Sequence, residues 1–139
     1  MTLNYAPPFD IPTSQRILLS DRAAGQVTIP GYLIGKPANS AKYLRYTMTR
    51  ALTFPANFAG SAAAAAATAT ASTTMDIQKN GVSCGTITFA LGAAVATFVS
   101  SGGAAVSFAA GDILGIVAQA SQDATLADIA VSLVANPTV

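Results

Sequence analysis

The dipeptide Asn80-Gly81 constrains the fold of this chain more than any other feature, because alternating segments flank it on both sides. Residues 73–79 and residues 82–90 each place apolar side chains at every second position over most of their length. A type I′ turn needs positive φ at both central residues, and Asn-Gly is the pair that supplies this most readily. The pattern therefore predicts a β-hairpin with its turn at residues 80–81.

The same period of two recurs along the chain, notably in residues 42–52 and 127–134. No segment of ten or more residues has the spacing of an amphipathic helix, and turn signals recur every 8–12 residues. These features predict an all-β fold, an antiparallel β-sandwich of jelly-roll-like type. Gly85 interrupts the alternation of its segment, which is typical of a β-bulge. The residues expected to be buried are Met75, Ile77, Ile87, Phe89, Ile129, Val131 and Leu133.

The alanine-rich stretch "SAAAAAATATAST", residues 61–73, is ambiguous when read alone. Alanine has the highest helix propensity of all residues. Read alternately, however, Thr68 and Thr70 fall on one face and Ala67 and Ala69 on the other, which is a strand pattern in a sheet context. We therefore expect a strand, with a short helix or loop as the alternative. How far through residues 62–71 the strand extends stays open.

The composition argues against an enzyme. Charged residues make up 9% of the chain, the net charge is +1, and His, Glu and Trp are absent. A Ser-His-Asp triad is therefore impossible, and acid–base catalysis would fall to Asp or Lys. The single cysteine, Cys84, can form neither an internal disulfide nor a zinc cluster, and we expect it to be a small buried residue. We expect no catalytic residue, no cofactor, no metal and no nucleic-acid partner.

Three aspartates could in principle contribute to a calcium site, namely Asp112, Asp123 and Asp128. Their positions favour turn and surface roles instead, because the first follows a glycine, the second lies in a polar loop and the third alternates outward on the last strand. The basic residues Lys42, Arg45 and Arg50 are expected on solvated faces or subunit contacts rather than in a nucleic-acid groove. Two charge-free stretches, residues 51–75 and 81–111, are interrupted by Pro, Asn or Gly, so no membrane insertion is expected.

The first thirty residues differ from the rest, because they contain four prolines and few alternating segments. Proline fixes φ and removes a donor, so we expect an extended N-terminal arm over residues 1–30 and the sandwich domain over residues 31–139. The arm is expected to attach the protein to another subunit, in part by adding a strand to an exposed sheet edge. The residues expected to make this attachment are Leu3, Tyr5, Phe9, Ile11 and Leu18.

Four phrases between Gly31 and Leu133 carry a resemblance to a known class of proteins: "GYLIGKP", "LTFPANFAGS", "TMDIQKNGVSCGTITFALGAAVATF" and "VSFAAGDILGIVAQASQDATLADIAVSL". In their order they resemble a Gly/Ala/Thr-rich β module of structural proteins of tailed bacteriophages, often tail-fibre-like proteins. The resemblance implies a non-enzymatic protein located in the virion, and it implies no catalytic residues.

Two functions are compatible with this resemblance. The first is an accessory decoration or cement subunit on the capsid, contacting other virion proteins and forming a homo-oligomer. The second is a tail-fibre or receptor-binding tip that contacts a host surface glycan. A glycan-binding tip usually exposes aromatic residues for stacking, and only Tyr32, Tyr43 and Tyr46 lie close together here, with Tyr46 expected in the core.

Overall fold

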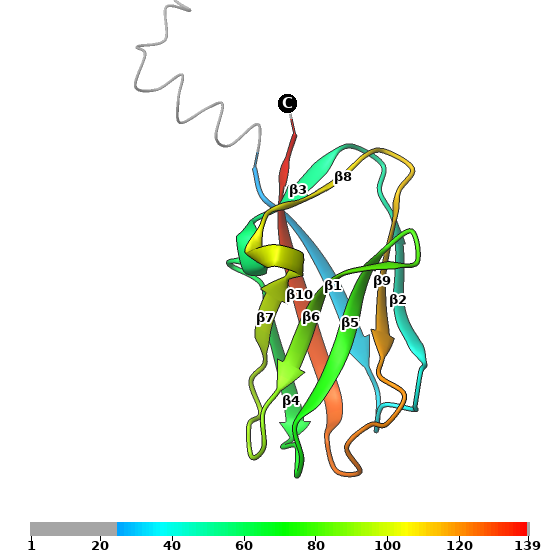
Figure 1. The fold of residues 1–139 in the computed structure, drawn as a ribbon, viewed down its shortest axis with the longest axis vertical. Coiled ribbons are helices and arrows are strands. Elements are labelled where there is room, and N and C mark those ends of the chain that lie inside the picture. The colour runs from blue at the N-terminus through cyan, green and yellow to red at the C-terminus, as the bar shows by residue number, and fades with distance from the viewer. Residues whose placement is uncertain (1–24, 139) are drawn as a thin grey trace, which may run out of the picture.

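The computed structural model describes residues 25–138 and confirms the predicted antiparallel β-sandwich (Figure 1). Two five-stranded sheets, with every pairing antiparallel, face each other across the core. The elements are β1 (Val27–Leu33), β2 (Lys42–Thr47), β3 (Leu52–Phe54), η1 (Ala56–Phe58), β4 (Ala62–Ala67), β5 (Thr73–Lys79), β6 (Val82–Phe89), β7 (Thr97–Ser100), η2 (Ser101–Gly103), β8 (Val106–Phe108), β9 (Ile113–Ala118) and β10 (Ala127–Pro137). No helix within residues 25–138 is long and apolar enough to cross a membrane.

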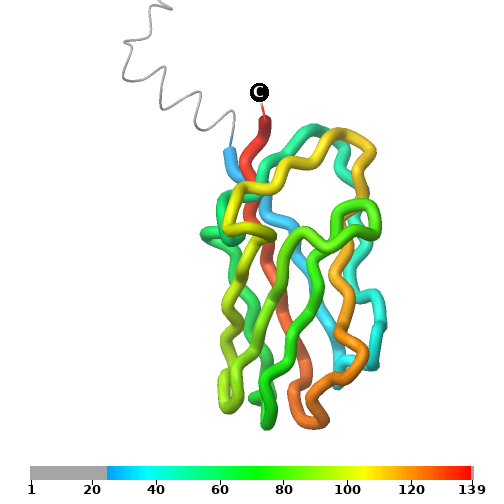
Figure 2. The backbone as a smooth tube through the Cα atoms, viewed as in Figure 1, coloured from blue at the N-terminus to red at the C-terminus, as the bar shows by residue number. Residues whose placement is uncertain are grey.

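The long strand β10 is the centre of the first sheet. It pairs with β1 along one side, from Val27–Ala135 to Leu33–Ile129, and with β4 and then β3 along the other. Figure 1 shows β1 and β10 running side by side along the length of the molecule. The second sheet has the order β2-β9-β5-β6-β7. Figure 2 shows that the first and last described residues lie at the same end of the sandwich, as the antiparallel β1–β10 pair requires.

The core contains the apolar residues that the alternation predicted. All seven expected residues are buried, and all seven belong to the one core cluster of the sandwich. Aromatic side chains close one end of the core, because the Phe54 ring lies 5.5 Å from that of Phe58 and 5.3 Å from that of Phe108. Such tilted and edge-on pairs add to the stability that area burial alone provides.

The hairpin predicted at residues 80–81 is present, with φ of 50° at Asn80 and 84° at Gly81. The predicted bulge is also present. Ile77 of β5 pairs with Gly85 of β6, and the next residue, Gln78, pairs with Ser83. The β6 residue between Gly85 and Ser83 therefore has no partner in β5.

The alanine-rich stretch forms a strand, β4, that ends at Ala67. Its odd-numbered alanines point toward the core and its even-numbered alanines are exposed. Residues 68–72 then cross from the first sheet to the second, so the stretch is not a strand throughout. Backbone bonds from Ala65 N to Ala94 O (2.8 Å) and from Ala96 N to Ala63 O (3.0 Å) join β4 to the segment that leads into β7. This segment connects the two sheets along that side of the sandwich.

The expected boundary after Pro30 falls inside β1. The strand begins at Val27, Ile29 is only 1% exposed, and Pro30 lies opposite Ser132. Residues 27–30 therefore belong to the first sheet, because the backbone of this segment completes the free side of β10. The predicted attachment residues Leu3, Tyr5, Phe9, Ile11 and Leu18 lie outside the described residues.

Several strands pair with a single neighbouring strand among residues 25–138, and β1 and β2 are two of them. Both carry features that discourage further pairing. Pro30 in β1 has no N–H, and β2 has a register shift between Lys42 and Leu44 and a second cation at Arg45. Proline, bulges and charged side chains are the usual devices by which proteins protect open sheet edges.

Candidate functional site

The three aspartates considered for a metal site serve the fold instead. Asp112 organises a turn: its carboxylate accepts hydrogen bonds from Ala109 N and Asn80 Nδ2, both at 2.8 Å, and pairs with Lys79 Nζ at 3.2 Å. The bond from Asn80, followed by that from Ala109, holds the pKa of Asp112 below its ordinary value. Within residues 25–138 no three metal-ligating side chains lie together.

Asp123 is buried, which corrects the expectation of a surface role. Only 8% of the residue is exposed, and its carboxylate accepts six hydrogen bonds. The donors are the backbone N–H and hydroxyl of Thr70, the N–H of Ala71, the N–H and hydroxyl of Thr125 and the N–H of Leu126, at 2.7–2.9 Å. These bonds, led by that from the Thr125 hydroxyl, hold the pKa of Asp123 far below its usual range. Asp123 thus ties the crossover after β4 to the loop before β10, and a polar loop sequence gives no sign of that distant partner.

Asp128 and Cys84 are also structural. Asp128 has a φ of 55°, and its carboxylate accepts a hydrogen bond from Gly35 N at 2.7 Å. Cys84 is buried as expected, and that burial, followed by the nearby charge of Asp76, raises the pKa of its thiol to about 11. A thiol with such a pKa stays protonated and unreactive at neutral pH. The surfaces of the two sheets remain as candidate functional sites.

The outer face of the first sheet is apolar and built from small residues. Its central row crosses four segments: Tyr32 pairs with Ala130, Ala130 with Ala64, and Ala64 with Val95. All four residues are exposed, Tyr32 by 61% and Val95 by 67%.

The neighbouring row adds Pro30, Ser132 and Ala62, and none of these side chains is charged. We call the surface formed by these two rows the apolar face. Its nearest carboxylate, that of Asp128, is already bonded to Gly35 N. Contiguous exposed apolar surface is one of the features by which sites of protein association are recognised.

The outer face of the second sheet is polar. Its rows contain hydroxyl, amide and charged side chains, for example Thr74 opposite Thr88 and Asp76 opposite Thr86. Asp76 accepts hydrogen bonds from Gln78 Nε2 (2.7 Å) and from the Ser83 hydroxyl. This outer face therefore carries charged and amide side chains that the apolar face lacks, beside exposed apolar residues such as Val99.

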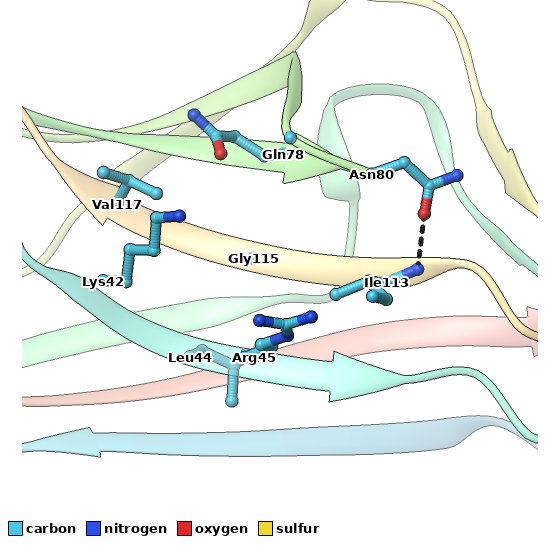
Figure 3. A pocket seen from close by; sticks show the side chains of 9 residues that line it. Lys42, Leu44, Arg45, Gln78, Asn80, Ile113, Gly115 and Val117 are labelled. Carbon is cyan, nitrogen blue, oxygen red and sulfur yellow. Dashed lines mark hydrogen bonds between the residues drawn. The ribbon is translucent and has the colours of Figure 1, made fainter.

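A groove of about 300 Å³ lies on this polar face, over strand β9 (Figure 3). Its floor is Gly115, which lies opposite Arg45 of β2 on one side and Gln78 of β5 on the other. Because Gly115 has no side chain, the sheet surface is hollow between these two neighbours. Figure 3 shows Lys42 and Arg45 along one wall and Gln78 and Asn80 along the other. We call this feature the β9 groove.

The β9 groove has positively charged side chains without acidic partners among residues 25–138. Neither Lys42 nor Arg45 forms an ion pair or a side-chain hydrogen bond there, and both are exposed. Of the two nearest carboxylates, Asp76 is bonded to Gln78 and Asp112 to Lys79 and Asn80. These two cations are two of the three basic residues that the sequence assigned to a solvated face or a subunit contact.

The three tyrosines considered for stacking do not form one platform. Tyr32 is exposed on the apolar face, whereas Tyr43 and Tyr46 are half-buried and pack against the core. The Tyr43 hydroxyl donates to Ala38 O at 3.1 Å. Tyr46 therefore lies at the core as expected, and no aromatic side chain lines the β9 groove.

Comparison with known proteins gives no match. No protein-family model matches the chain, and no curated protein or solved structure matches it either.

Sequence reasoning missed both surfaces. The outward positions of β4 are alanines, like the inward ones, so the sequence of β4 alone does not distinguish its two faces. The one available signal for the apolar face was the absence of charge between residues 51 and 75. The β9 groove depends on the pairing of three strands that are distant in sequence, which no local pattern reveals.

Proposed function

We propose that this protein is a non-enzymatic structural subunit of a tailed-phage virion, namely an accessory decoration subunit on the capsid. The observation that supports this proposal best is the apolar face. A protein with so few charges and a flat uncharged sheet surface gains stability when that surface is covered by a neighbour. The resemblance of residues 31–133 to phage structural modules is the reason for proposing a phage particle.

The size of the apolar face suggests how such a subunit would be held. With strands about 4.8 Å apart and about 6.6 Å between successive rows, a row over four segments and a row over three cover roughly 200 Å² of flat area. Stable protein interfaces bury about 800 Å² on each partner. The face would therefore supply about a quarter of a stable contact. We propose that residues 1–24, with Leu3, Tyr5, Phe9, Ile11 and Leu18, supply the rest on the particle or on a neighbouring copy.

The decisive experiment is a binding assay with particles that lack this protein. Ala64 lies in the middle of the apolar face and is exposed, so Ala64→Lys introduces a charge there without disturbing the core. We expect Ala64→Lys to reduce the affinity for particles by more than about tenfold, since it would bury an unpaired ammonium group in the contact. Removal of residues 1–24 should weaken attachment as well while β1 stays in place.

The matched control is Thr47→Lys, which adds the same charge at an exposed position of the other sheet. It should bind particles like the unmodified protein. Circular dichroism and thermal unfolding of both variants should match those of the parent protein. Undiminished binding of Ala64→Lys would exclude the apolar face as the docking surface.

A second function, a tail-fibre or receptor-binding tip that contacts the host surface, is favoured by a different observation. The β9 groove lies on the sheet opposite the apolar face, so it would remain accessible when the apolar face is covered. Immunolabelling of intact virions would distinguish the two locations, because a decoration subunit labels the capsid and a tip labels the distal tail.

A further inference from the structure

We infer that the β9 groove is a binding site for an acidic saccharide, with the carboxylate of a uronic or sialic acid unit held by Lys42 and Arg45. This inference does not depend on where in a virion the subunit is located. It follows from the shape of the groove, from the groups on its two walls and from the ligand classes that those groups exclude.

The shape comes from Gly115. Its neighbours in the ladder, Arg45 and Gln78, carry long side chains, so the missing side chain leaves a hollow between them. Ile113 and Val117, two positions away along β9, bound the hollow at its ends. A volume of about 300 Å³ is at the lower end of the range for small-molecule sites, and it suits one sugar ring.

The two walls offer complementary chemistry. On the β2 side, the Lys42 ammonium and the Arg45 guanidinium are donors without acidic partners among residues 25–138. A guanidinium can bind a carboxylate with two parallel hydrogen bonds. On the β5 side, Gln78 Nε2 is committed to Asp76 at 2.7 Å, which directs Oε1 away from that carboxylate as an acceptor for a hydroxyl group. An anion on one side and a hydroxylated ring on the other match these walls.

Other ligand classes fit the groove less well. Nucleic-acid binding relies on about 6–10 phosphate contacts and on aromatic stacking, whereas the groove has two cations and no aromatic side chain. A metal ion would be repelled by the two cations. The alternative role for Lys42 and Arg45 is to protect the open edge of β2 from pairing with another chain. If that were their only role, replacing them would cause self-association and would leave saccharide binding unchanged.

The test is an NMR titration of the full-length protein with glucuronate, N-acetylneuraminate, glucose and sulfate. We expect saturable shifts centred on the amides of Gly115 and Gln78 with the two acidic sugars. Glucose should cause no such shifts, and sulfate should bind more weakly than glucuronate because it lacks the ring hydroxyls. Equal affinity for sulfate and glucuronate would overturn the saccharide assignment, as would the absence of saturable shifts with both acidic sugars.

Variants separate the two roles of the cations. Arg45→Gln should weaken glucuronate binding by at least about fivefold, and Gly115→Leu, which fills the hollow and keeps both cations, should abolish it. Arg50→Gln is the matched control, since Arg50 is exposed outside the groove and should not affect binding. Unchanged affinity in Gly115→Leu, or self-association of Arg45→Gln with unchanged affinity, would refute the site.

Discussion

Gly85 is the residue at which a single added carbon should be most costly. A Cβ on Gly85 would overlap the Phe58 ring at Cε2 and would lie 2.8 Å from the backbone oxygen of Val99. Phe58 itself is 1% exposed and packs against Phe54, so its ring has little room to move. The Val99 oxygen belongs to the strand that pairs with β6, so moving it would disturb the β6–β7 ladder. The conformation of Gly85 is not the obstacle, because its φ is not in the left-handed region.

The expected magnitude follows from these contacts. Overpacking a well-filled core costs about 1–3 kcal/mol, and a clash with backbone favours the upper end of that range. We therefore expect Gly85→Ala to reduce the free energy of unfolding by about 3 kcal/mol, which lowers Tm by roughly 10 °C in a domain of this size. Urea unfolding followed by circular dichroism measures the change directly.

Gly115→Ala is the matched control, because it is the same substitution in the same sheet. A Cβ on Gly115 would meet its nearest atoms at 3.7 and 3.8 Å, which are ordinary contacts. This variant should be neutral or more stable by up to about 1 kcal/mol, since alanine restricts the unfolded chain. If both variants had the same stability, the steric argument at Gly85 would be wrong. The double variant Gly85→Ala, Phe58→Leu should lose about 1 kcal/mol less free energy of unfolding than the sum of the two single losses. The reason is that Phe58→Leu removes the ring that an alanine at position 85 would overlap.

Three further predictions concern buried groups. Asp123→Asn should lower the free energy of unfolding most at neutral pH. Folding lowers the pKa of Asp123, so the ionised carboxylate stabilises the folded state at pH values above the unfolded pKa of about 3.9. This stabilisation is lost progressively as the pH falls below that value. The difference in the free energy of unfolding between the parent protein and Asp123→Asn should therefore shrink as the pH is lowered from 7 to 2. A difference that stays constant would contradict the role given to the ionised carboxylate. The Cys84 thiol, with its pKa raised to about 11, should react with an alkylating reagent at pH 8 far more slowly in the native protein than in urea, as mass spectrometry can measure. Phe89→Ala should reduce the free energy of unfolding by about 3–5 kcal/mol, since the Phe89 side chain is completely buried, and a loss below 1 kcal/mol by urea unfolding would show that the site repacks.

Much of the fold was determined by local sequence. The alternation of residues 73–79 and the Asn-Gly pair specify the hairpin, because side-chain direction has a period of two and few residues tolerate positive φ. Gly85 predicted the bulge because it interrupts the period-two alternation of its own segment. These features depend on neighbours within a few residues, so they can be read without knowledge of the tertiary structure.

The surfaces and the buried aspartate were decided by tertiary structure alone. Asp123 finds its donors at Thr70 and Ala71, more than fifty residues earlier in the chain, and only the packing of the two loops brings them together. The apolar face and the β9 groove arise in the same way, from strands that are neighbours in space and distant in sequence, such as β4 beside β10 and β9 between β2 and β5. Local alternation determines which side chains of a strand share a face, but the pairing of distant strands determines which faces become one surface.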